Sequence, residues 1–472
     1  MDNINALLRE LPAVDRLLRE PLLEELQLKF PRKVVLQAVQ ETIDSYRSRI
    51  TSGSSDLSEL PQAGELHPAN LACEAAALAE KKAGLNLKPL INATGIIIHT
   101  NLGRAPLSKQ AVEALTGVAA NYNNLELSLE TGKRGSRQEH LESLICEISG
   151  AEAAVVLNNN AAAVFIALNA LAGGLEVVVS RGQLVEIGGS FRIPEIMAAS
   201  GAKLVEVGTT NKTYLRDYEA VVNDNTAAFL KVHSSNYHMV GFTAGVETAG
   251  LAELARKHNL LLIEDLGSGV FLDLEKYGLP HEPRVQDSIS AGADLVTFSG
   301  DKMLGGPQCG IIVGREDLVA RIRKNQLARA LRVDKFTIAA LEATMRLYLD
   351  EEKAITEIPV WRMLAADPAL LEMRAKVLAS RFSEIVGSEN VSILEGISKV
   401  GGGALPTAEL PTYLVAVKPV NHGAEEIVKK LRLNDPPVIL RLQHDMLLFD
   451  PRTVFEDQED ILVQALEMAY RD

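Results

Sequence analysis

The sequence predicts an α/β protein: a mostly parallel sheet flanked by helices, preceded by a small helical domain and followed by a small α+β domain. Three observations predict this. The first fifty residues carry only helical periodicity. Between about residues 91 and 335, short apolar runs alternate with longer helical segments. Beyond residue 385 the chain carries the strand patterns VSILEG, TYLVAVKP and VILRLQHDMLLFD before a final helix.

The N-terminal residues 1–65 are predicted to form the helical domain. Apolar residues recur at helical spacing in LLRELPAVDRLLREPLLEELQLKF and PRKVVLQAVQETIDSYRSRI, and Pro31 suits the first turn of a helix. Ser, Gly and Pro are frequent in TSGSSDLSELPQAGELHP, so we expect a linker or loop between Thr51 and Pro68. A linker helix containing CEAAALAEKKAG is expected within residues 66–90.

The large domain is predicted over residues 91–335. Its strands are expected at the seven apolar runs AAVVLN, LEVVVSRG, KLVEVG, AAFLKVHSS, LLLIEDL, DLVTFSG and QCGIIVG. Continuous apolar strands separated by helices are typical of a parallel sheet covered on both faces, which binds ligands at the carboxyl ends of its strands. Residues 336–472 are predicted to hold connecting helices and the small α+β domain.

Composition indicates a cytoplasmic globular protein. With 472 residues, of which 47% are hydrophobic, the chain can bury the cores of two or three domains. The first twenty residues lack the apolar stretch of a signal peptide or membrane span, so no membrane partner is expected. The three scattered cysteines predict neither disulfides nor a metal site. A net charge of −14 argues against indiscriminate nucleic-acid binding, but a local basic patch can still bind RNA.

Lys302 is the strongest candidate for a catalytic residue. In DLVTFSGDKMLGGPQCGIIVG, a strand ending at Phe298 or Ser299 leads into a tight loop that presents this lysine. A lysine in such a pocket has a depressed pKa and forms a Schiff base with an aldehyde cofactor. The alternative is a solvated loop lysine.

Asp265 ends the apolar strand LLLIED, where a carboxylate can pair with a protonated pyridine nitrogen and make the ring an electron sink. Aspartates at strand ends also cap loops or bind metals. Its position before Lys302 in the chain favours the pairing with a ring.

The segment AAVVLNNNAAAVFIALNALAGG predicts a strand, a turn and a helix whose first backbone N–H groups can bind a phosphate. Asn159, Asn160 and Ala161 lie at this turn, and Ser299 can supply a hydroxyl group to the same phosphate. The asparagines are equally suited to capping the helix.

The order of phosphate turn, Asp265 and SGDK resembles the fold-type I pyridoxal 5'-phosphate enzymes. The resemblance implies this cofactor, a seven-stranded sheet and a dimer with a shared active site. In AAFLKVHSSNY, His233, Ser234 or Asn236 can contact the cofactor ring or its phenolic oxygen. A buried His233 without a catalytic role is the alternative.

Two further segments, INATGIIIHTNLGRAPLS and RGQLVEIGGSFRIPEIM, closely resemble the bacterial selenocysteine synthase family over essentially the whole chain. The resemblance implies conversion of seryl-tRNA(Sec) to selenocysteyl-tRNA(Sec), with selenium supplied by selenophosphate. It further implies a helical N-terminal domain that holds the tRNA, and a homo-oligomeric ring of dimers, expected to be a decamer. The candidate tRNA contacts are basic residues that a solvated surface would equally explain: Lys29, Arg32, Lys33, Arg47 and Arg49.

The same resemblance assigns the selenium donor's phosphate to Arg104, in NLGRAP, and to Arg329 and Arg332, in LARALRVDK. Guanidinium groups bind oxyanions bidentately, and Arg329 and Arg332 share a helical face if the helix continues. Arg441 is placed where related enzymes clamp a substrate carboxylate. Because the carboxyl group of an aminoacyl-tRNA is esterified, Arg441 would instead bind a phosphate or stabilise its domain.

Two alternatives to this function follow from the same residues. One is a fold-type I lyase acting on a free amino acid or amino sugar, with Arg441 as carboxylate clamp. The other is a regulator that binds pyridoxal phosphate or RNA without turnover. No other nucleotide or metal motif competes, since GxxxxGK[ST] and HExxH are both absent from the sequence.

Overall fold

The computed structural model describes residues 2–52, 61, 64–189 and 191–471. Two compact units divide the chain at Pro89 and Leu90. Among the helices in these ranges, none is long and apolar enough to cross a membrane.

The first unit, Met1–Pro89, is helical as predicted. Its helices are α1 (Asp2–Glu10), α2 (Val14–Leu17), α3 (Pro21–Lys29), α4 (Arg32–Ser52) and α5 (Pro68–Ala83). Helix α5 buries Leu71, Ala75 and Ala79 in the same core as Leu23 and Val39. The boundary predicted at residue 65 therefore differs from the structure, because α5 packs within this unit. Most of the linker predicted between Thr51 and Pro68 lies outside the described residues.

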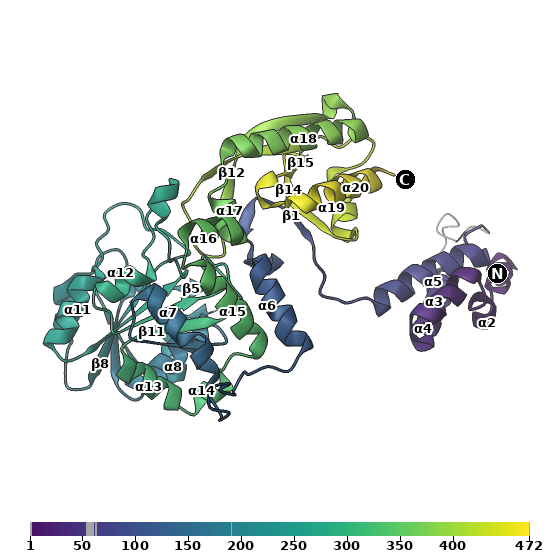
Figure 1. The fold of residues 1–472 in the computed structure, drawn as a ribbon. Coiled ribbons are helices and arrows are strands. Elements are labelled where there is room, and N and C mark those ends of the chain that lie inside the picture. The colour runs from purple at the N-terminus through teal and green to yellow at the C-terminus, as the bar shows by residue number, and fades with distance from the viewer. Residues whose placement is uncertain (1, 53–60, 62–63, 190, 472) are drawn as a thin grey trace. The chain divides into compact units, whose positions relative to one another are not determined.

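A seven-stranded sheet forms the centre of the second unit, as predicted (Figure 1). Its strands lie in the order β3 (Ala153–Leu157), β11 (Gly310–Gly314), β10 (Leu295–Ser299), β9 (Leu261–Gly267), β8 (Thr226–Val232), β4 (Glu176–Ser180) and β7 (Lys203–Val207). All neighbouring pairs are parallel except those of β11, which runs antiparallel to both β3 and β10. The short strands β5 (Glu186–Ile187) and β6 (Phe191–Arg192) form a separate hairpin.

Helices cover both faces of this sheet because its strands are apolar on both sides. Alternate residues of β3 enter two different cores, Ala154 and Val156 in one and Val155 and Leu157 in the other. The first core includes residues of α7 (Glu142–Ser149), α11 (Thr248–Lys257), α12 (Val285–Ser290), α15 (Lys335–Leu347) and α17 (Pro359–Leu364). The second includes residues of α8 (Asn160–Ala172), α9 (Ile193–Ser200) and α13 (Glu316–Lys324). The remaining helices of this region are α6 (Lys109–Ala120), α10 (Leu215–Glu219), α14 (Leu327–Ala330) and α16 (Glu351–Glu357).

The C-terminal part is an α+β arrangement, also as predicted, around a six-stranded sheet. Its order is β1 (Ile91–Ala93), β14 (Val438–Gln443), β15 (Met446–Phe449), β13 (Leu410–Val417), β12 (Val391–Gly401) and β2 (Ile96–Ile98). Helices α18 (Pro368–Val386), α19 (Ala424–Leu433) and α20 (Glu459–Tyr470) share its core and lie beside it in Figure 1. Residues 91–98 were predicted to open the large domain, but β1 pairs with β14 and β2 with β12.

Candidate active site

Lys302 lies in a buried loop between β10 and β11. Its exposure is only 5%, and the flanking Asp301 is equally buried. The loop is closed by backbone hydrogen bonds, in which Gly306 N donates to Gly300 O (2.8 Å) and Met303 N donates to Ser268 O (3.1 Å). Removal from water lowers the pKa of Lys302, since a buried ammonium group is poorly solvated. The amine is therefore more available as a nucleophile and a base than that of an exposed lysine.

Asp265 is a fully buried carboxyl group on β9, next to the β10 strand that leads to Lys302. Asn160 Nδ2 and Thr297 Oγ1 both donate to its Oδ1, at 2.7 and 3.1 Å. Burial raises the pKa of Asp265, while Asn160, Thr297 and the charge of Lys302 oppose that rise. A carboxyl group held in this way is stabilised as an anion by a neighbouring cation. A protonated pyridine ring nitrogen is such a cation.

The Asn159–Asn160 turn joins β3 to α8. Asn159 is the N-cap residue, and its side-chain oxygen accepts from Ala162 N (2.9 Å). The capping alternative therefore holds for Asn159, whereas Asn160 reaches across to Asp265. Ala161 is half-buried in the first turn of α8, where backbone N–H groups are without helical acceptors. Gly310 fits against this turn because an added Cβ would lie 2.1 Å from Asn159 O.

His233 directly follows β8, and its backbone N donates to Asp265 O (2.8 Å). The ring Nδ1 lies 3.5 Å from Glu282 Oε1. Of the neighbouring candidates, Asn236 donates to Glu186 O (2.9 Å) and Ser234 is half-buried. Ser299 is buried at the end of β10, as predicted.

Several buried polar atoms near these residues have no hydrogen-bond partner among the described residues. They include Asn160 Oδ1, His233 Nδ1, Ser235 Oγ and Glu282 Oε1. Buried polar groups in folded proteins are normally satisfied, so a local excess of free ones indicates a polar ligand. Lys302 fits the aldehyde of pyridoxal phosphate, Asp265 fits its pyridine nitrogen, and the N-terminus of α8 fits its phosphate.

Arg104 lies beside the Lys302 loop, although the two are far apart in sequence. Its Nη1 pairs with Asp301 Oδ2 at 2.7 Å, and the charge of Arg104 further lowers the pKa of Lys302. The backbone at Arg104 has a φ of 65°, which a sharp turn after the helical residues Thr100–Leu102 imposes. The structure thus brings Arg104 and Lys302 together through Asp301, a residue to which the sequence analysis gave no role.

Arg329 and Arg332 line a cavity of about 420 Å³ at the edge strand β3, with three other arginines, Arg134, Arg137 and Arg323. The expectation of a shared helical face is wrong. Helix α14 ends at Ala330, and Arg332 instead forms a β-bridge with Leu157. Glu126 partly balances the charge, since it lies 3.6 Å from Arg332 Nη1. Among the described residues that line this cavity, Lys302 and Arg104 are not found.

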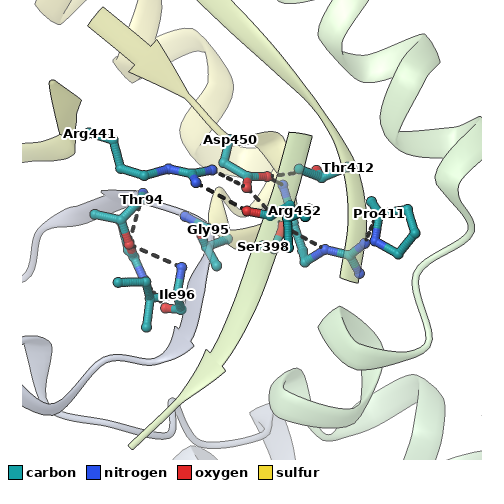
Figure 2. Close-up of polar contacts among 12 residues, drawn as sticks. Thr94, Gly95, Ile96, Ser398, Pro411, Thr412, Arg441, Asp450 and Arg452 are labelled. Atoms are coloured by element: carbon teal, nitrogen blue, oxygen red, sulfur yellow. Dashed lines mark hydrogen bonds and ion pairs between the residues drawn. The ribbon is translucent and has the colours of Figure 1, made fainter. Parts of the chain in front are cut away.

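Arg441 points into the C-terminal sheet rather than toward the Lys302 loop. Its Nη2 pairs at 2.9 Å with Asp450, whose side chain is fully buried, and its Nη1 donates to Ile397 O (3.1 Å). Figure 2 shows Ser398 and Thr412 donating to the same carboxylate. Gly95 is required nearby, because an added Cβ would lie 1.9 Å from Asp450 Oδ2. This network favours a stabilising role for Arg441 over a carboxylate clamp.

An Arg441→Ala substitution separates these roles. Because it leaves the buried Asp450 short of a charged donor, we expect the free energy of unfolding to fall by about 1–3 kcal/mol. Turnover per folded molecule should change little. Chemical denaturation and steady-state kinetics measure the two effects, with Arg432→Ala, an exposed arginine on α19, as control. A raised KM at unchanged stability would instead identify a substrate clamp.

Comparison with known proteins identifies the family of the chain. The family model described as L-seryl-tRNA selenium transferase matches residues 90–455, and the model described as selenocysteine synthase N terminal matches residues 8–47. An L-seryl-tRNA(Sec) selenium transferase of Moorella thermoacetica is 49% identical over 468 residues, covering 98% of both chains. One from Clostridium botulinum (strain Okra / Type B1) is 47% identical and covers 97% of both.

A solved structure, that of D-glucosaminate-6-phosphate ammonia-lyase, has a TM-score of 0.55 at 21% identity and covers 83% of this chain and 97% of its own. This likeness confirms the predicted fold. The matches to the two family models and the full-length relatives establish the family. The chain belongs to the L-seryl-tRNA selenium transferase family.

Proposed function

We propose that this chain converts seryl-tRNA(Sec) to selenocysteyl-tRNA(Sec), with pyridoxal 5'-phosphate as cofactor and selenophosphate as selenium donor. The observation that carries the proposal is the placement of Lys302 and Asp265 at the ends of adjacent strands, within electrostatic reach of each other and both buried. The full-length similarity to L-seryl-tRNA(Sec) selenium transferases supports the choice of substrate.

When bound, pyridoxal phosphate supplies an aldehyde that binds amines and a cationic ring that withdraws electrons from the substrate Cα. Lys302 would hold the aldehyde, and its Nζ, once free, would accept the Cα proton of the seryl group. Asp265 would keep a proton on the ring nitrogen, because its buried carboxylate needs a cationic partner. The phosphate would be bound by Asn159, Asn160 and Ala161 at the start of α8, together with Ser299.

The selenium donor is assigned to the arginines. Arg104 is held by Asp301 next to Lys302, so it can place an oxyanion close to the substrate Cβ. Arg329 and Arg332 line a different cavity, that of five arginines at β3. They are assigned to the donor's phosphate by the family resemblance, and the positive charge of that cavity supports the assignment. The serine hydroxyl would leave as water and selenium would add at Cβ. Lys302 Nζ would then return a proton to Cα, and hydrolysis of the Se–P bond would release phosphate.

The helical first unit is proposed to hold the tRNA. Of the five basic candidates, Lys29, Arg47 and Arg49 already pair with Glu25, Asp44 and Glu65. Arg32 and Lys33 are exposed at the start of α4, whose first turn contains no acidic residue. The N-terminal end of a helix is itself partly positive, so these cationic side chains add to its charge. The combined positive charge favours an anionic partner such as the RNA backbone.

Self-association into a ring of dimers belongs to the same proposal. Large apolar side chains are exposed on two loops of the second unit, with Tyr122 and Leu129 on one and Val240 and Phe242 on the other. Such exposure is typical of surfaces that bind another chain. The decamer expected from the family resemblance would cover these loops with further copies of the chain.

The direct test is to incubate the purified full-length chain with seryl-tRNA(Sec) and selenophosphate and to analyse the amino acid esterified to the tRNA. We expect selenocysteine. Free serine in place of the charged tRNA is the control, and its turnover would favour a lyase for small amino acids. If the absorption band shows that the cofactor is bound but the seryl-tRNA stays unchanged, the result would favour a regulator without turnover.

A further inference from the structure

Glu282 is a buried acidic residue that the proposed reaction does not use. It lies in the segment between the short helical turn Leu274–Tyr277 and α12, with 6% exposure. Its Oε1 is shielded from solvent and has no hydrogen-bond partner in the described part of the chain. A buried carboxyl oxygen without a partner is unfavourable for folding, so this oxygen is expected to bind a neighbouring donor of the site.

The nearest partner of this oxygen is the imidazole ring of His233. The Glu282 Oε1 to His233 Nδ1 distance is 3.5 Å, which is close enough for an ion pair but longer than a good hydrogen bond. His233 Nδ1 is itself buried and unpartnered within the described ranges. A small side-chain rotation would join the two atoms and satisfy both.

The pair lies among the groups that the reaction needs. His233 binds the backbone of Asp265. Burial raises the pKa of Glu282, and the groups that oppose this rise are His233 at the end of β8, Ser268 after β9, His281 on the same segment, and Lys302. The charge of Glu282 in turn raises the pKa of Lys302. Glu282 therefore acts on the strand ends that carry Asp265 and Lys302.

We propose that Glu282 is a positioning residue for His233: its carboxylate accepts a hydrogen bond from Nδ1 and fixes the orientation of the ring. The inference rests on the proposed function, which gives the contact its chemical purpose. The contact itself does not depend on the identity of the substrate. Because Nδ1 faces Glu282, the second ring nitrogen, Nε2, faces away from it and is left to bind the cofactor or substrate.

The test compares Glu282→Gln with wild type by carbethoxylation of the full-length protein with diethyl pyrocarbonate at a fixed pH, followed by peptide mass mapping. Glutamine lacks the charged acceptor that would hold the His233 ring through Nδ1, so the ring is freer to react. We expect His233 to be modified faster in Glu282→Gln than in wild type. An unchanged rate would overturn the proposal.

The chain contains a matched control. His281 Nδ1 lies 3.4 Å from Glu275 Oε2, but both side chains are about two-thirds exposed, at 66% and 65%. Because water screens an exposed pair, Glu275→Gln should change the rate of His281 modification much less than Glu282→Gln changes that of His233. Equal changes in the two rates would contradict the proposal, because they would mean that the buried pair holds its ring no better than the exposed pair does.

A second readout uses the absorption band of the bound cofactor without substrate. We expect Glu282→Gln to move its titration to lower pH, because a negative charge near Lys302 is lost. His233→Asn removes the ring that Glu282 orients, so Glu282→Gln should shift the titration of the band by a different amount in that background than in wild type, since the two residues act as a unit. Additive shifts would overturn the pairing. If these shifts occur but the wild-type protein does not convert seryl-tRNA, only the proposed substrate would be overturned.

Misfolding is not expected to confuse the test. The pKa of Glu282 is raised in the folded state, so folding favours its protonated form. The contribution of Glu282 to the free energy of unfolding is therefore present below its unfolded-state pKa and is lost as the pH rises through its folded-state pKa. Glu282→Gln should consequently unfold no more easily than wild type at neutral and higher pH. Thermal unfolding of both proteins verifies this.

Discussion

Lys302→Met is expected to fold, to lose the covalent link to the cofactor and to lose turnover by on the order of 10²–10⁴-fold, the usual contribution of a positioned acid–base group. Methionine keeps much of the apolar stem of the lysine, and the ammonium group that it removes is poorly solvated in the folded state. The absorption band of the bound cofactor and the conversion of seryl-tRNA(Sec) measure the two losses.

The control is Lys276→Met, which removes an exposed lysine paired with Glu351 on the surface of the same unit. It should retain both the absorption band and the turnover, since exposed pairs contribute little. Turnover by Lys302→Met at the wild-type rate would contradict the assignment of Lys302 as the base.

Asp265→Asn is expected to reduce kcat by about 10²–10³-fold, a size typical of losing one preorganised electrostatic contact. The amide keeps an oxygen that can accept from Asn160 and Thr297, so the local hydrogen bonds survive while the charge opposite the ring nitrogen is lost. Thr297→Val is the matched control, because it removes one hydrogen bond and keeps the carboxylate. Equal rates for Asp265→Asn and wild type would contradict the ring-nitrogen contact.

The same variant has a pH signature without cofactor. The pKa of Asp265 is raised in the folded state, so folding without cofactor favours its protonated form. The contribution of Asp265 to the free energy of unfolding is therefore present below its unfolded-state pKa and is lost as the pH rises through its folded-state pKa. Cofactor-free Asp265→Asn should therefore gain stability relative to wild type as pH rises. Denaturation at a series of pH values measures this difference.

Much of the site could be predicted from the sequence because its main residues lie at the ends of apolar strands. Lys302 and the Asn159–Asn160 turn follow such runs, Asp265 lies two residues before the end of β9, and parallel strands bring their carboxyl ends to one edge. Thr297 was missed although it alternates with Ser299 on the same strand. It lies opposite Asp265 in the β9–β10 register, which only the pairing of the strands shows.

Other features depended on contacts between distant segments. Glu282 comes from an irregular segment with no periodicity to mark it, and β1 pairs with β14 across more than three hundred residues of chain. The helix expected through Arg332 stops at Ala330, because the following residues pair with Asn158 and Leu157 at the edge of the sheet. Local patterns specify which elements form, whereas these pairings are determined by the tertiary packing of the whole unit.

The central claim is that Lys302 Nζ carries the cofactor. Borohydride reduction of the purified, cofactor-loaded protein, followed by proteolysis and mass mapping, makes this bond permanent and locates it. We predict a single pyridoxyl label on Lys302 that is absent from Lys302→Met. A label on another lysine, with Lys302 unmodified, would contradict the account.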